Sequence, residues 1–189
     1  IAAICALQLA GGLDYLVRIA ENILRKNPKH INYLAPTVTY FLTILAGTGH
    51  TAFSMIPVIV EVAKSENIKP SVPLSIAVVA SQIGITASPV SAAVVAMSGF
   101  LEPYGVNYPT LLAICISTTF VGVMITAFIM STFANNDLSS DPVYQERLAA
   151  GHVAPPREKN TDFHLKPGAK ASVLIFLIGI ICIVFYATA

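Results

Sequence analysis

One uninterrupted run of apolar and small residues, 110–133, carries no charged side chain. A helix needs about 20 such residues to cross the hydrocarbon core of a bilayer, so this run is long enough to span it. Composition agrees, because 55% of the 189 residues are hydrophobic and 11% are charged. A typical soluble domain is about 25% charged. We therefore expect an all-α integral membrane protein made of transmembrane helices.

Three further apolar stretches belong to the same pattern. Residues 171–189 predict the start of the next transmembrane helix, and residues 1–13 indicate the end of a helix that begins upstream. Residues 74–101 are long enough to cross, but Pro89 and several small polar residues interrupt them, which predicts a broken helix. The chain begins and ends inside apolar runs, so we expect it to be a piece of a longer protein.

Residues 31–64 predict a re-entrant helical hairpin. Its two apolar arms, 31–46 and 52–63, are about 16 and 12 residues long, which is short of the roughly 20 that a span requires. They are joined by the glycine-rich sequence GTGHT at 47–51. Irregular backbone at membrane depth is tolerated only where it is buried in protein or lines a wet cavity. Two complete crossings stay open as the alternative.

The remaining segments carry the charge. Residues 14–30 have apolar side chains at helical spacing among charged ones, which predicts an amphipathic helix on the membrane surface. Residues 134–170 are hydrophilic and rich in proline, which indicates a solvated loop. With a hairpin at 31–64, every basic residue falls on one side of the membrane, and the positive-inside rule makes that side cytoplasmic. These residues are Arg18, Arg25, Lys26, Lys29, Lys64, Lys69, Arg147, Arg157, Lys159, Lys166 and Lys170.

The hairpin tip is the first candidate site, with residues Thr48, Gly49, His50 and Thr51. Glycine permits a tight turn and lets a ligand approach the backbone. Thr48 or Thr51 can cap the second arm, which directs amide N–H groups at the tip. His50 can donate a hydrogen bond or carry a proton near neutral pH. The alternative is a plain loop whose histidine faces water.

The interruption in the broken helix is the second candidate site. Pro89 suits the first position of a new helix and Ser88 is a favourable N-cap, so we expect one helix to end near Thr86 and another to start at Pro89. The alternative is a proline kink whose small residues allow close helix packing. The polar residues gathered around this point are Ser81, Gln82, Thr86, Ser88 and Ser91.

Two helix starts that meet near the middle of the membrane would form an anion site, because the positive ends of the helix dipoles and unpaired amides converge there. A small dianion could place one carboxylate at each start. The three cysteines lack the paired spacings of a metal site, so no metal or other cofactor is expected. The net charge of +1 gives no basic face for nucleic acid. Coupling to H⁺ or Na⁺ stays open.

The chain resembles the anaerobic C4-dicarboxylate transporters of bacteria, the Dcu type. The resemblance runs through most of the sequence and is most specific in GGLDYLVR, LAGTGH and ITASPVSAA. It implies a multi-pass carrier of the bacterial inner membrane that exchanges or takes up fumarate, malate, aspartate and succinate. It also implies an inverted-repeat architecture with a hairpin and a broken helix in each half, of which this chain would hold one. By this similarity Thr48, Gly49 and His50 match the hairpin tip, and Thr86, Ser88 and Pro89 match the helix break.

The leading hypothesis is therefore a secondary transporter of C4-dicarboxylates that works by alternating access. A membrane-embedded hydrolase with Ser88 and His50 as a nucleophile and base is one alternative, although no carboxylate lies within the middle of any apolar segment to orient the histidine. A transporter of another small anion is a second alternative. A sensor partner could bind the loop at 134–170, and a homo-oligomer is compatible with everything above.

Overall fold

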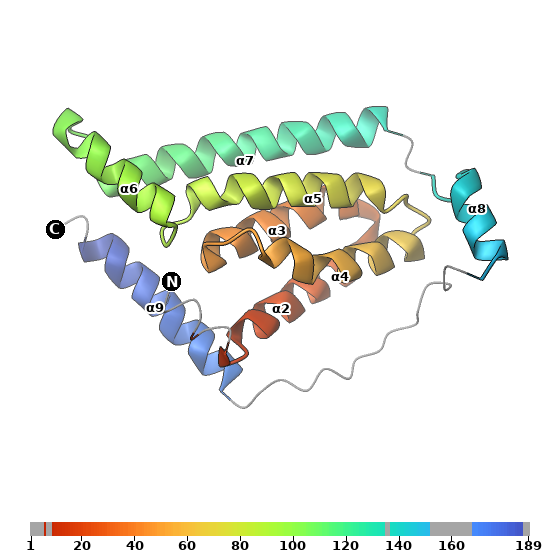
Figure 1. Ribbon diagram of the computed structural model, residues 1–189, viewed down its shortest axis with the longest axis horizontal. Helices are drawn as coiled ribbons and strands as arrows, with labels where there is room; N and C mark the ends of the chain where they lie inside the picture. The colour runs from red at the N-terminus through yellow and green to blue at the C-terminus, as the bar shows by residue number, and fades with distance from the viewer. Residues whose placement is uncertain (1–5, 7–8, 135–136, 152–167, 187–189) are drawn as a thin grey trace.

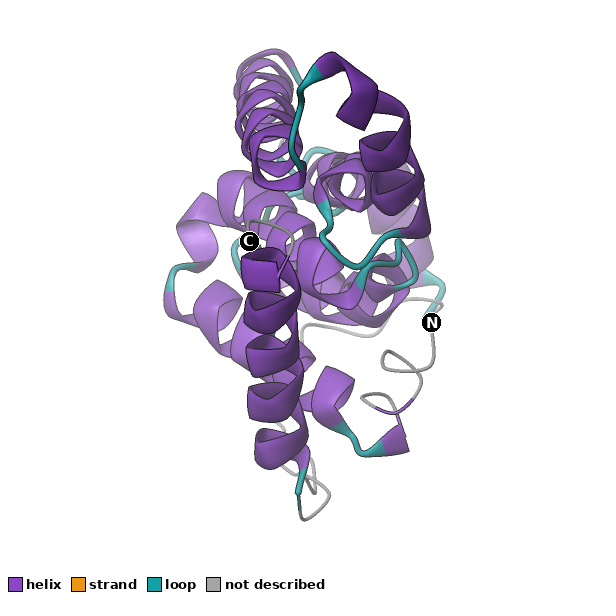
Figure 2. Cartoon of the chain, turned by 90° about the vertical axis from the view of Figure 1, so that its left-hand side faces the viewer, coloured by secondary structure: helices purple, strands orange, loops and turns teal. Residues whose placement is uncertain are grey.

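The computed structural model describes residues 6, 9–134, 137–151 and 168–186 (Figure 1). Within these ranges the chain is helical and contains no strand, as Figure 2 shows, which confirms the all-α prediction. The helices are α2 (Gly12–Lys26), α3 (Ile31–Ala46), α4 (Thr51–Ser65), α5 (Ser71–Gly84), α6 (Ala92–Leu101), α7 (Tyr108–Phe133), α8 (Pro142–Ala149) and α9 (Ala169–Tyr186), with short 3-10 turns η1 (Pro28–His30), η2 (Ile85–Ala87) and η3 (Glu102–Tyr104).

Several helix ends follow directly from local sequence. The side chain of Asn107 accepts a hydrogen bond from the amide of Thr110 and so caps α7, and Asp141 caps α8 by accepting from the first amides of that helix. Both helices have proline in their first turn, where the missing N–H is not needed. Helix α3 ends at Gly47, whose φ of 65° is in the left-handed region that glycine adopts without strain.

Helices α3, α5 and α7 lie side by side, and α4 and α2 cover the other side of α3 (Figure 1). One apolar cluster joins α2, α3 and α4 through Leu24, Ile31 and Met55, all of which are fully buried. A second cluster joins α3, α5 and α7 around Tyr40 and Val123. Because both clusters include residues of α3, it is the central helix of the structure.

In the described part of the chain, α7 is long and apolar enough to cross a membrane, and 17% of its most apolar stretch is buried in the structure. The pair formed by α5 with η2 and by α6 with η3 is also long and apolar enough if it is counted as one span. This pair bends by 43° at the break near Pro89. Helix α9 is described only to Tyr186, and the remainder of the predicted span at 171–189 lies outside the described residues.

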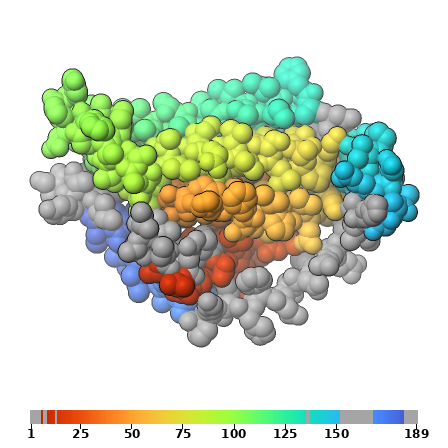
Figure 3. All heavy atoms as spheres, in the orientation of Figure 1, coloured from red at the N-terminus to blue at the C-terminus, as the bar shows by residue number. Residues whose placement is uncertain are grey.

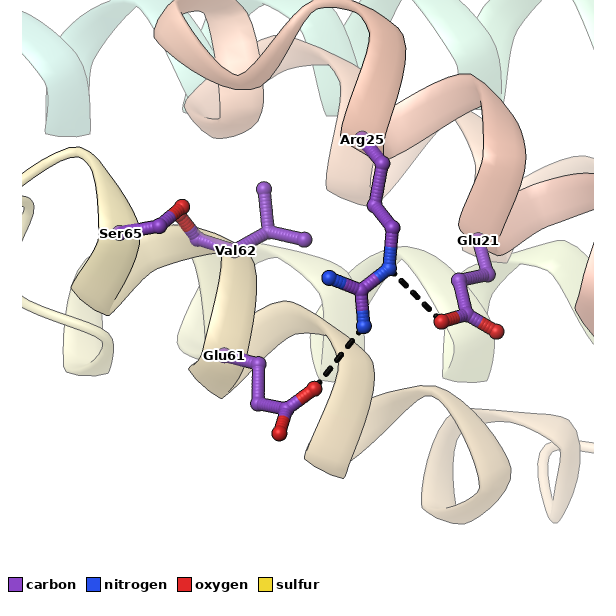
Figure 4. Close-up of polar contacts among 5 residues, drawn as sticks. All are labelled: Glu21, Arg25, Glu61, Val62 and Ser65. Carbon is purple, nitrogen blue, oxygen red and sulfur yellow. Dashed lines mark hydrogen bonds and ion pairs between the residues drawn. The ribbon is translucent and has the colours of Figure 1, made fainter. Parts of the chain in front are cut away.

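An ion-paired arginine joins α2 to α4. Arg25 donates to Glu21 from Nε at 2.8 Å and to Glu61 from a terminal nitrogen at 2.9 Å (Figure 4). Glu61 on α4 therefore has a specific partner on α2. The three side chains retain between 23% and 36% of their exposure, so water screens the interaction.

We expect Arg25→Gln to weaken the attachment of α2 by about 0.5–1 kcal/mol, the usual range for a partly exposed ion pair. The measurement is the free energy of unfolding of the purified full-length protein. Glu61→Gln and the double variant complete a cycle that isolates the pair. Effects of the two single variants that simply add would show that Arg25 and Glu61 do not interact in the folded protein.

Part of the predicted loop at 134–170 is ordered against the helices. Leu138 donates its amide to the carbonyl of Asn67 at 3.0 Å, and the side chain of Asn67 donates to Asp137 at 2.8 Å. Lys69 forms an ion pair with Asp141, directly before α8. These contacts place the start of α8 beside the α4–α5 connection. Residues 152–167 of the predicted loop, and most of 1–13, lie outside the described residues.

Candidate functional site

The tip between α3 and α4 is a compact turn. Gly47 donates its amide to the carbonyl of Thr43 at 2.8 Å, which closes the last turn of α3. The hydroxyl of Thr48 accepts from the amide of His50 at 3.4 Å, and the amide of Ala52 donates to the carbonyl of Gly49 at 3.2 Å. Every one of these bonds is local, so the turn forms from its own sequence.

Buried hydroxyl groups attach this turn to the neighbouring helices. The hydroxyl oxygens of Thr43 and Thr51 are 2.7 Å apart, and Thr43 also donates to Ser81 at 3.1 Å. Ser81 in turn donates to the carbonyl of Gly49 at 3.0 Å. All three side chains are completely buried. A buried hydroxyl is stable only with a partner, so this network holds the tip in one position on α5.

Gly49 is also in close contact with the next residue of α5. A Cβ atom built on Gly49 would lie 2.7 Å from the side-chain nitrogen of Gln82, closer than real contacts allow. Glycine at this position therefore lets the amide group of Gln82 lie over the backbone of the tip. Gln82 is exposed, and so is His50, whose ring stacks on Phe53 with centroids 5.9 Å apart. The tip thus presents polar side chains at the surface of the chain.

The helix break differs in detail from the sequence prediction. The α-helix ends at Gly84 and η2 continues to Ala87, but the next helix starts at Ala92, three residues after Pro89. Ser88 is extended, with φ −88° and ψ 127°, because a residue before proline avoids the helical region. Ser91 occupies the N-cap position in place of Ser88, and its side chain makes no cap hydrogen bond.

The hydroxyl of Ser88 has a tertiary partner as well as a local one. It donates to the carbonyl of Ile44 in α3 at 2.7 Å and accepts from the amide of Val90 at 3.3 Å. The hydroxyl of Tyr108, at the start of α7, donates to the carbonyl of Pro89. The break is therefore held from two sides, by α3 and by α7.

The predicted capping of the second arm is also wrong. Helix α4 starts at Thr51 with His50 before it, and no side chain caps it. The hydroxyl of Thr48 is bonded to the amide of His50, and that of Thr51 to Thr43 and to the carbonyl of Thr48. Both threonines hold the shape of the turn, and neither satisfies the first amides of α4.

The structure brings some of the predicted residues together and leaves others apart. Gly49, Thr51, Ser81 and Gln82 meet where the tip contacts α5. Ser88 contacts the end of α3, and Ser91 is buried at the start of α6. Thr86 is exposed, and its hydroxyl bonds within its own helix to the carbonyl of Ile83. Because the hydroxyl of Ser88 bonds to the carbonyl of Ile44, it is not oriented toward His50 as a hydrolytic nucleophile would be.

Sequence reasoning missed three residues that hold the site. Thr43 connects the tip to α5, Tyr108 fixes the break, and the hydroxyl of Tyr40 lies 2.7 Å from that of Thr119 and so joins α3 to α7. Thr39 and Thr43, one helical turn apart in an apolar arm, were a usable signal for a buried polar face. No comparable signal marked the tyrosines. Among the described residues, no group of three His, Cys, Asp or Glu side chains could hold a metal ion.

Comparison with known proteins decides the family. The model of the anaerobic C4-dicarboxylate membrane transporters matches residues 1–189, the whole chain. The chain belongs to this family. It is 70% identical over 189 residues to the C4-dicarboxylate transporter DcuA of Wolinella succinogenes, which is 100% of this chain and 43% of that protein. It is 52% identical over 187 residues to the DcuA of Escherichia coli K12, covering 99% of this chain and 43% of the relative. No solved structure matches the chain.

The matched family is described as one of membrane transporters, and the relatives are named as transporters. The anaerobic C4-dicarboxylate transporter DcuB of Escherichia coli O6:H1 is also similar, with 41% identity over 154 residues, which cover 79% of this chain and 34% of the relative. The chain spans less than half the length of the curated relatives that it matches.

Proposed function

We propose that this chain is one half of a secondary carrier of C4-dicarboxylates such as fumarate, succinate, malate and aspartate. The carrier would work by alternating access, through exchange or symport, in the bacterial inner membrane. One observation carries the proposal: Ser81 bonds to the carbonyl of Gly49, which attaches the hairpin tip to α5 immediately before the helix break. Discontinuous helices of this kind are the recurring binding element of secondary transporters.

The groups at the hairpin tip and at the helix break both suit a carboxylate. The first amides of an α-helix have no partner within that helix, and the positive end of the helix dipole lies there, so the start of α6 after Ser91 attracts an anion. Gln82 and His50 are exposed beside the tip and can both donate hydrogen bonds. Helix-start dipoles and neutral donors would then bind the substrate, with further groups from the rest of the carrier.

We further propose that α3 and α4 form a re-entrant hairpin and that α5 and α6 form a broken span, as one half of an inverted repeat. The 43° bend near Pro89 supports the second assignment. The ion pair between Arg25 and Glu61 supports the first, because it places the end of α2 beside the returning arm of the hairpin. Lys69 lies at the same end, paired with Asp141. This basic end would face the cytoplasm under the positive-inside rule.

The test is fumarate–succinate exchange by the full-length carrier reconstituted into liposomes. We expect His50→Ala and Gln82→Ala each to lower exchange about tenfold, since losing a hydrogen bond worth about 1.4 kcal/mol changes binding by that factor. Both side chains are exposed, so the variants should fold and insert normally. Matched controls are His30→Ala and Asn22→Ala, which remove the same types of group from exposed positions remote from the tip.

Wild-type exchange in both tip variants would refute the assignment of the site. A carrier that exchanges a different small anion but no C4-dicarboxylate would refute the proposed substrate class. The assignment of the site would be unaffected. Equal losses in the two controls would show that exchange responds to any exposed polar substitution, and the tip would then have no special role.

A further inference from the structure

A small basic cavity lies at the end of the molecule opposite the hairpin tip. It is formed where the α4–α5 connection meets α8, which lies at that end of the molecule in Figure 1 and in Figure 3. Three interactions described above hold α8 there: the amide of Leu138 to Asn67, the side chain of Asn67 to Asp137, and Lys69 to Asp141. The cavity therefore depends on contacts between segments about 70 residues apart in sequence.

Three basic side chains lie among the nine residues around this cavity. Its volume is about 230 Å³, and its lining includes Lys64, Lys69 and Arg147 as cations and Asp141 as the one carboxylate, a net charge of +2. Pro70, Ser71, Leu138, Val143 and Tyr144 complete it. A volume below the usual 300–1,000 Å³ of drug-sized pockets suits a small charged group.

The carboxylate in the lining is already engaged. One oxygen of Asp141 accepts the amides of Val143 at 3.0 Å and Tyr144 at 3.2 Å, and the other is paired with Lys69. The hydrogen bond from Lys69, with help from the amide of Tyr144, lowers the pKa of Asp141. Asp141 therefore stays ionised at neutral pH and holds Lys69 at the cavity. Lys64 and Arg147 then supply the remaining positive charge.

We propose that this cavity binds the phosphate of an anionic phospholipid headgroup. Guanidinium and ammonium groups form short, charge-assisted hydrogen bonds with phosphate oxygens, and arginine can contact two of them at once. The cavity lies at the ends of α4 and α5 where, in a membrane transporter, helices meet the headgroup region. Basic pockets on the cytoplasmic side of membrane helices are known headgroup sites. The apolar lining residues Val143 and Leu138 can contact the glycerol and first methylene groups.

This inference is independent of the substrate that the carrier transports. A bound lipid would connect α8 and the hydrophilic segment around it to the membrane surface. It would also stabilise the folded carrier, because any ligand that binds the folded state alone raises the free energy of unfolding.

The experiment measures the melting temperature of the purified full-length carrier in a neutral detergent during titration with phosphatidylglycerol. Parallel titrations use phosphatidylcholine, which has no net charge, and inorganic phosphate, which has no lipid. We expect phosphatidylglycerol to raise the melting temperature by several degrees. In the Lys64→Gln, Arg147→Gln double variant, the phosphatidylglycerol concentration that gives half of the rise in melting temperature should increase about tenfold or more. The reason is that two charge-assisted hydrogen bonds are lost.

The matched control is Lys26→Gln with Lys29→Gln, which removes the same charge from exposed positions outside the cavity. If the control variant loses the lipid effect equally, the assignment of the site is wrong, because stabilisation by the lipid would then depend only on the overall charge of the protein. Equal stabilisation by phosphatidylcholine would overturn the role of the phosphate charge. An equal rise in melting temperature with inorganic phosphate would assign the cavity to a free anion and overturn the proposal that it binds a lipid. Arg147 is exposed, so Arg147→Gln alone provides the same test if the double variant does not fold.

Discussion

Replacing Gly84 with valine is expected to separate α3 from α5 and to abolish most transport by the full-length carrier. A Cβ atom at Gly84 would lie 3.2 Å from the carbonyl oxygen of Tyr40 and 3.3 Å from Cβ of Thr43. The first neighbour is backbone and cannot rotate away. Valine adds two methyl groups beyond this Cβ, and overpacking of this kind costs about 1–3 kcal/mol.

The same displacement would move Thr43 away from Ser81 and so break the hydroxyl network that holds the tip. Melting temperature and exchange rate should therefore fall together in Gly84→Val, and Gly84→Ala should show a smaller loss of both. Gly122→Val is the control, because nothing lies within 4 Å of a Cβ at that position of the described chain. A Gly84→Val carrier that melts and transports like the wild type would contradict the close packing of α3 on α5.

Ser81→Ala should have the second largest effect, and it should fall mainly on transport. The substitution removes the hydrogen bond to the carbonyl of Gly49 and one of the two hydroxyl partners of Thr43, which keeps Thr51. Hydrogen bonds between membrane helices contribute about 0.6 kcal/mol on average and at most about 1.7 kcal/mol, so stability should change little. Gly49 keeps a second bond, from the amide of Ala52, so the turn itself should survive.

The tip would nevertheless lose its fixed position relative to Gln82. A loss of about 1.4 kcal/mol in substrate positioning corresponds to a tenfold lower exchange rate. Ser75→Ala is the matched control, since that serine lies on α5, is exposed, and donates only to the carbonyl of Ser71 in its own helix. If both serine variants exchange at the same rate, the attachment of the tip to α5 has no role in transport.

Local sequence was sufficient wherever a structural feature depends on neighbouring residues. The uncharged run at 110–133 predicted α7, and the glycines at 47 and 49 predicted the turn. The position of the second half-helix was wrong by three residues. Ser88 and Pro89 form a good local cap sequence, and the hydroxyl of Ser88 accepts from the amide of Val90 as a cap would. The same hydroxyl also donates to the carbonyl of Ile44, a contact with α3 that local sequence does not reveal, and α6 begins only at Ala92.

The candidate site shows the same division. Its residue types were visible in sequence, because small polar residues and a proline inside an apolar helix are unfavourable in lipid without a partner. Their grouping was not visible. Thr43 was overlooked, although it connects Thr51 to Ser81. Its spacing from Thr39 indicates a buried polar face, but that spacing does not identify a partner 38 residues further along the chain.

The sequence by itself determined that this chain is a helical membrane protein with two interrupted segments, and its motifs indicated the transporter family. Apolar run length and helix-breaking residues act over a few neighbours, so they can be recognised without a structure. Only the tertiary structure decided that the tip is fastened to α5, that the break is held by α3 and Tyr108, and that basic side chains gather beside α8. Those arrangements arise from buried hydrogen bonds and ion pairs between distant segments, and each exists only once the helices have packed.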